Sequence, residues 1–106
     1  MIIVTTEYIP GMEIKEYKGF VRGTTVQSKH IGKDIMASLR TIVGGEIKEY
    51  KEMMEEARQK AIGRMVEDAK QKGANAIIGV RIATSSIMAN TSEIVAYGTA
   101  VFVEEK

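Results

Sequence analysis

The only histidine in the sequence, His30, stands in the polar stretch 28–33, so a metal site or a general base would have to be built around it. A zinc site usually takes three or four ligands, mostly nitrogen or sulfur, and the chain has no cysteine. A solvated loop histidine is therefore the favoured interpretation. A metal site at His30 remains an alternative if a ring of subunits gathers one imidazole from each subunit around its axis.

Two arginines and a tyrosine are the candidates for anion binding. Arg40 and Arg81 carry permanent guanidinium charges, and Tyr97 would lie opposite Arg81 if the last two strands form a hairpin that turns near Asn90. The ordinary alternative for each arginine is a salt bridge or a contact with an aromatic ring. We assign Arg40, Arg81 and Tyr97 as the candidate ligand-binding residues, in a pocket between subunits.

No catalytic arrangement stands out, and we assign no catalytic residue and no cofactor. The carboxylates have no spacing that sets acid–base geometry, and helix capping and the helix dipole explain Asp34 and Glu46. The glycine pairs do not fit the spacing of Rossmann or P-loop sequences. Methionines such as Met54 and Met65 are better explained as packing residues than as thioether ligands for copper.

Composition narrows the classes of partner. The net charge of +1 gives no strong field, so neither a nucleic-acid partner nor an anionic membrane is expected. The sequence begins without the basic and apolar regions of a signal peptide, and no stretch approaches the ~18 apolar residues of a membrane span. We expect a single domain, residues 1–106, that is soluble and cytoplasmic.

The elements that position these residues are organised around a long helix from Glu46 to Gly73. Its apolar residues recur at spacings of three and four, which places them along one stripe. Gly73 ends the helix, because a residue just past a helix end often needs a left-handed conformation that glycine adopts easily. The stripe comprises Ile47, Tyr50, Met54, Ala57, Ala61, Met65 and Ala69.

Before the long helix, the sequence predicts two strands and a short helix. Residues 2–6 form a short strand, and a Pro-Gly turn over 9–12 precedes a long, bent strand over 13–27. Gly19 and Gly23 inside that strand indicate bulges or a close approach of another backbone. Asp34 then caps a short helix whose apolar face runs from Ile35 to Val43.

After the long helix, two strands form a hairpin. Alternation places Ala76, Ile78, Val80 and Ile82 on one face of the first strand. The last strand, Glu93 to Val103, is apolar on both faces. A single helix layer can cover only one of these faces, so we expect the second face to be buried between subunits of a homo-oligomer.

Several short motifs follow one another along nearly the whole chain. They are Asp34 with Ala37-Ser38-Leu39-Arg40, Val43-Gly44-Gly45, Tyr50, Glu56-Ala57-Arg58, Gly73-Ala74-Asn75-Ala76 through Gly79-Val80, and Gly98-Thr99-Ala100-Val101. These motifs resemble the YbjQ-like proteins, small uncharacterised chains labelled "putative heavy-metal-binding". The resemblance implies rings of five subunits and a dodecin-like α+β fold, in which an antiparallel sheet packs on one long helix in the order β-β-α(short)-α(long)-β-β. Some relatives have acidic residues where this chain has Arg81 and Ala83, which weakens the metal interpretation here.

Three function hypotheses follow. The leading one is a non-enzymatic binding or scaffolding protein, a pentamer or decamer, with a small-molecule ligand between its subunits. The first alternative is a heavy-metal-binding protein that uses His30. The second alternative is an enzyme with a shared site between subunits, built from Arg40, Arg81 and Tyr97.

Overall fold

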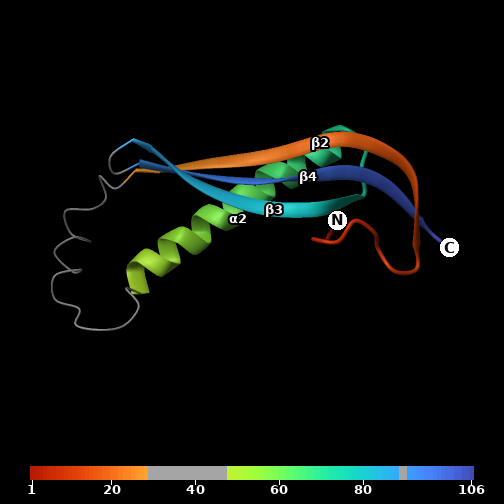
Figure 1. Cartoon of the computed structure of the whole chain (residues 1–106), viewed down its shortest axis with the longest axis horizontal. Coiled ribbons are helices and arrows are strands. Elements are labelled where there is room, and N and C mark those ends of the chain that lie inside the picture. Colours follow the sequence, from red (N-terminus) through yellow and green to blue (C-terminus); the bar gives the residue numbers. More distant parts are fainter. Residues whose placement is uncertain (29–47, 89–90) are drawn as a thin grey trace.

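The computed structural model describes residues 1–28, 48–88 and 91–106. In that part the chain forms the predicted α+β fold, with one helix packed on one face of a four-stranded sheet (Figure 1). The short helix expected after Asp34 and the turn expected at Asn90 lie outside the described residues. The elements are β1 (Ile2–Ile3), β2 (Met12–Ser28), α2 (Lys48–Gln71), β3 (Ala76–Met88) and β4 (Thr91–Glu105), and the strand order across the sheet is β1-β3-β4-β2.

The sheet is mixed, which corrects the expectation that all its strands are antiparallel. β1 pairs with β3 in parallel, with Ile2 beside Ala76. The Pro-Gly turn forms as predicted, because the amide of Met12 donates to the carbonyl oxygen of Ile9 at 3.0 Å. The turn does not make a hairpin, since β1 and β2 lie at opposite edges of the sheet.

The long helix ends as the sequence predicts. Gly73 has a φ of 77°, in the left-handed region. Its amide donates to the carbonyl oxygen of Lys70 at 3.0 Å, and the amide of Ala74 donates to that of Ala69 at 3.1 Å. This pair of bonds is the Schellman arrangement, which satisfies carbonyl groups that the helix would otherwise leave without partners. The chain thereby reverses directly from α2 into β3.

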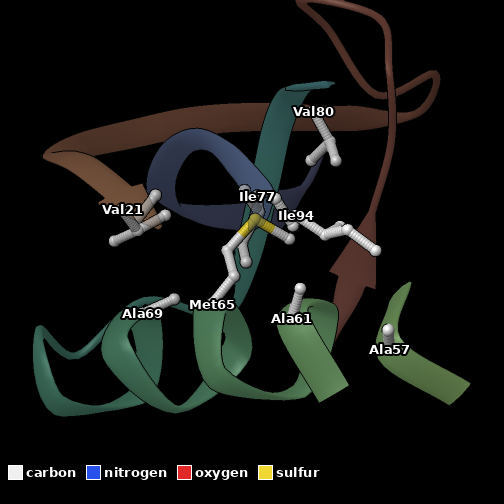
Figure 2. Close-up of a cluster of buried hydrophobic side chains, with 10 residues drawn as sticks. Val21, Ala57, Ala61, Met65, Ala69, Ile77, Val80 and Ile94 are labelled. Carbon is white, nitrogen blue, oxygen red and sulfur yellow. The ribbon is translucent and has the colours of Figure 1, made fainter. Parts of the chain in front are cut away.

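The main core lies between α2 and the sheet (Figure 2). Four residues of the predicted stripe, Ala57, Ala61, Met65 and Ala69, are fully buried. Three of the four are alanines, so the helix axis can lie close to the sheet. These four residues pack with Val21, Ile77, Val80, Ile94, Ala96 and Ala100.

A bulge at Gly79 overturns the predicted alternation of β3. Gly79 has a φ of 61°, and the register with β4 shifts between Ile78 and Arg81. The extra residue places Ile77 and Val80 together in the core beneath the helix, although the alternation predicted opposite faces. Beyond the bulge, Arg81 shares a face with Ile78.

Part of the second sheet face is covered by the chain's own N-terminal segment, residues 1–11. The amide of Val4 donates to the carbonyl oxygen of Ile77 at 3.0 Å, and the amide of Gly79 donates to that of Thr6 at 2.8 Å. A second cluster forms there, so intersubunit burial is not needed for this half of the face. The cluster comprises Ala76, Ile78, Val101 and Val103, with Val4, Ile9, Met12 and Ile14 packed against them.

Candidate functional site

The half of the sheet that the N-terminal segment leaves uncovered presents the candidate site. We use the name open face for this uncovered part of the sheet surface that is turned away from α2. Val21 of β2 and Ala96 of β4 point into the core beneath the helix, so their neighbours along each strand point to the open face. On β2 and β4 these neighbours include Phe20, Arg22, Val95 and Tyr97.

Three open-face residues stand in one row across three strands. Tyr97 of β4 pairs with Arg22 of β2 on one side and with Arg81 of β3 on the other. We call these three residues the arginine row. Because neighbouring strands lie about 4.8 Å apart, the two arginine backbones are separated by roughly 10 Å. Tyr97 therefore lies between two arginines in the row.

An exposed aromatic ring borders the row. Phe20 lies diagonally across from Tyr97, with the two ring centroids 6.3 Å apart and the ring planes tilted by 37°. Such a distance and tilt suit an attractive contact between aromatic rings. Phe20 nevertheless leaves 62% of its surface exposed. The row is thus continuous with an accessible aromatic surface.

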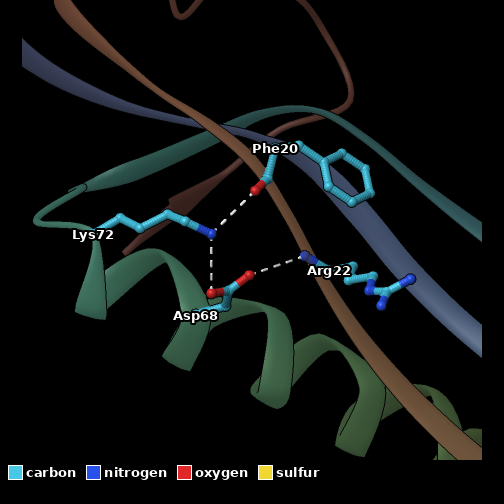
Figure 3. Close-up of polar contacts among 4 residues, drawn as sticks. All are labelled: Phe20, Arg22, Asp68 and Lys72. Atoms are coloured by element: carbon cyan, nitrogen blue, oxygen red, sulfur yellow. Dashed lines mark hydrogen bonds and ion pairs between the residues drawn. The ribbon is translucent and has the colours of Figure 1, made fainter.

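The polar face of α2 sets the positions of Phe20 and Arg22 (Figure 3). β2 is an edge strand, so the backbone N–H and C=O groups on its outer side have no neighbouring strand to bond with. The ammonium of Lys72 donates to the carbonyl oxygen of Phe20 at 3.2 Å, and the amide of Arg22 donates to Oδ2 of Asp68 at 3.3 Å. Further along, Arg64 donates to the carbonyl oxygen of Thr24. The helix therefore holds the β2 backbone, while both side chains extend over the open face.

The second guanidinium is held by main-chain oxygens. Nη1 of Arg81 donates to the carbonyl oxygen of Thr5 at 2.9 Å and to that of Val80 at 2.8 Å. These bonds orient the group without neutralising its charge. Because only Nη1 is engaged in them, the remaining donors of the guanidinium fork stay available for a ligand.

The positive charge of the row is not balanced by a carboxylate in the part of the chain that the structure describes. Neither Arg22 nor Arg81 forms an ion pair there. The pairs that do form use lysines: Lys15–Glu13, Lys18–Glu16, Lys60–Glu56 and Lys72–Asp68. Guanidinium groups recognise carboxylates and phosphates by paired hydrogen bonds, so the row has the chemistry of an anion site.

The structure brings together two of the predicted site residues and adds two more. Arg81 and Tyr97 pair across β3 and β4 as expected, whereas Arg40 and His30 lie outside the described residues. Sequence reasoning missed Arg22 and Phe20. Their alternation along β2 was visible, but nothing local showed that this strand runs beside Tyr97.

Two further features bear on the classes of site considered. No group of three or more His, Cys, Asp and Glu side chains suited to a metal ion occurs within residues 1–28, 48–88 and 91–106. Over the same ranges, no helix has both the length and the apolar character needed to cross a membrane.

Comparison with known proteins gives a family and a fold. Residues 1–104 match a family described as "Putative heavy-metal-binding". A UPF0145 protein of Halalkalibacterium halodurans is 61% identical to this chain over 106 residues, which is 100% of both chains. A UPF0145 protein of Vibrio parahaemolyticus is 62% identical over 99% of this chain and 100% of its own length. A solved structure of a protein with unknown function, from the DUF74 family of Pediococcus pentosaceus, is 18% identical with a TM-score of 0.64 over 98% of each chain, which shows the fold alone.

Proposed function

The chain belongs to the YbjQ-like family described as "Putative heavy-metal-binding", and we propose that it is a non-enzymatic binding protein. In this proposal the chain forms a homo-oligomer and holds an anionic ligand at the arginine row. The proposed assembly is a ring of five subunits, or a pair of such rings, in the cytoplasm. The ring of five is what the resemblance to YbjQ-like proteins implies. The ligand would lie between neighbouring subunits.

The observation that carries the proposal is the arginine row itself. Two arginine residues flank Tyr97 on an open sheet face, and neither forms an ion pair with a carboxylate of the described residues. A ligand with negative charge that lies in the row would be attracted by both cations. It would also gain charge-assisted hydrogen bonds to both arginines.

The edge of β3 beyond Val80, which no other described strand pairs with, supports assembly. From Arg81 to Met88 every residue of this strand is exposed, and β1 pairs with β3 only at its opposite end. Proteins usually protect such an edge with lysine, proline or a covering segment, but the sequence of this stretch has no lysine and no proline. A second copy of the chain is the occupant we propose. In a ring of five the contact is heterologous, so the β3 edge of one subunit would meet a different surface of the next subunit.

Pyrophosphate is the probe that tests the site. In calorimetric titrations, Arg22→Ala and Arg81→Ala should each weaken its binding by about ten- to a hundredfold, because a hydrogen bond to a charged group contributes ~1.5–3 kcal/mol. Lys60→Ala is the matched control: it also removes one positive charge, but from an exposed pair with Glu56 on α2. An equal loss in all three variants would show only nonspecific attraction and would contradict the proposed site.

Light scattering on the same samples tests the assembly. We expect a mass that is a multiple of 11.7 kDa at micromolar concentration, five or ten subunits being the proposed numbers. A monomeric mass would contradict the assembly. Absence of pyrophosphate binding to the native chain would contradict the ligand.

A heavy-metal site fits the described residues poorly. They contain no ligand cluster for a metal ion, and Arg81 adds a fixed cation to the open face. His30, outside the described residues, remains the only imidazole. A soft or borderline metal selects thiolate and imidazole ligands, which this chain hardly offers.

We therefore expect zinc, copper and nickel to bind no more tightly than a dissociation constant of about 1 µM. The measurement is a titration of each metal into the native oligomer and into His30→Ala. Stoichiometric, sub-micromolar binding that disappears in His30→Ala would show that a ring gathers its imidazoles into a real metal site.

A further inference from the structure

Phe20 is the feature of the open face that anion binding leaves unexplained. An exposed phenylalanine on a strand is costly in water, and here it leaves 62% of its surface accessible beside Tyr97. On the same face, Phe20 pairs with Thr99, and the neighbouring pair along the two strands is Tyr17 with Val101, where Tyr17 is 67% exposed. The surface beside the arginine row is therefore aromatic and exposed.

We propose that the ligand of the arginine row is a nucleoside diphosphate, with its base stacked on Phe20 and its two phosphates along Arg22, Tyr97 and Arg81. This inference rests on the proposed anion-binding function and names its ligand class. An aromatic side chain on an open antiparallel sheet is a common platform for a nucleobase, because every base offers a flat π surface.

The geometry of the two strands matches such a ligand. Phe20 and Arg22 are two residues apart on the same face of β2, which corresponds to about 7 Å along the strand. In a nucleotide, the ribose separates the base from the first phosphate by a similar distance. From Arg22 the row continues across β4 to Arg81, so a diphosphate whose first phosphate meets Arg22 would extend its second phosphate towards Tyr97 and Arg81.

The charge around the row favours one small ligand over a polynucleotide. Glu93 of β4 faces the same side but stands four residues from Tyr97, about 13 Å along the strand, beyond the Debye length at physiological salt. The phosphates would therefore meet little repulsion. With a net charge of +1, the chain lacks the extended basic surface that a longer nucleic acid requires.

Three matched probes test the proposal on the native oligomer by calorimetry: pyrophosphate, adenosine and ADP. ADP should bind at least tenfold more tightly than pyrophosphate and than adenosine, since only ADP can use both Phe20 and the arginines. Phe20→Leu should bring the affinity for ADP down to that for pyrophosphate and leave pyrophosphate binding unchanged. Leucine keeps the apolar volume and loses the π surface, so a merely structural role of Phe20 would leave ADP binding intact.

Val26→Ala is the control on the same face and strand: Val26 is 56% exposed and lies away from the row, so ADP binding should not change. ADP binding no tighter than pyrophosphate, or unaffected by Phe20→Leu, would overturn the nucleotide assignment while leaving the anion site in place. Failure of pyrophosphate itself to bind would instead overturn the proposed function. A ten-residue single-stranded DNA that binds more than tenfold tighter than ADP would also overturn the assignment.

Discussion

Gly23→Ala is expected to lower the free energy of unfolding by about 3 kcal/mol, because no side chain fits between β2 and α2 at this position. A Cβ built on Gly23 would overlap the carbonyl oxygen of Ala61 and the amide nitrogen of Met65, and it would come within 2.8 Å of Cβ of Arg64. Two of these three neighbours are helix backbone atoms, which cannot move aside without shifting the whole helix. Urea denaturation at matched protein concentration measures the loss.

Gly63→Ala is the matched control for this substitution. Gly63 lies on the exposed side of α2, and a Cβ there would have no neighbour within 4 Å. Alanine should stabilise the helix at that position by about 0.5–1 kcal/mol. If Gly23→Ala instead left the stability within ~0.5 kcal/mol of the native chain, the helix could not lie against β2 as described.

Met65→Ala should be the second large effect, a loss of about 3 kcal/mol of stability. Met65 is fully buried and among the largest such side chains, at the centre of the cluster between the helix and the sheet (Figure 2). Truncation removes buried apolar surface and leaves a cavity, and the reported range for such changes is ~2–5 kcal/mol. The neighbours Ala61 and Ala69 are too small to fill the space.

Met65→Leu tests whether volume is the cause. Leucine nearly conserves the volume of methionine, so the expected loss is under about 1.5 kcal/mol. Chemical denaturation of the two variants, with oligomer mass checked for each, separates cavity formation from loss of assembly. Equal destabilisation by leucine and alanine would mean that shape or the thioether, rather than buried volume, decides the contribution of Met65.

Local chemistry allowed several elements to be predicted. The helix period and the stop at Gly73 depend on neighbours within one or two turns. The structure confirms both, together with the burial of the predicted stripe from Ala57 to Ala69. The bent strand was predicted from its inner glycines: Gly19 has a φ of 104° at a register shift, and Gly23 lies against the helix backbone. Both positions favour a residue without a side chain, and the sequence shows glycine at each of them.

The candidate site was only half predictable. Arg81 and Tyr97 could be paired because a hairpin links them through a short connection, and the register confirms that pair. Arg22 and Phe20 come from a strand at the other end of the chain. Their place beside Tyr97 depends on β2 pairing with β4, and no local pattern specifies that partner.

The α+β class, the long helix with its apolar stripe, and the positions where glycine is required can be predicted from residue order alone, because they follow from spacings and backbone preferences within a few residues. Three features appear only in the folded chain: β1 joins β3 in parallel, the bulge at Gly79 reverses the faces of β3, and the N-terminal segment covers part of the second sheet face. Those outcomes depend on contacts between distant segments and on one residue shifting a register, and a shift of one residue turns every later side chain to the opposite face. The same shift at Gly79 sets Arg81 on the open face, where it pairs with Tyr97 of β4 and completes the arginine row.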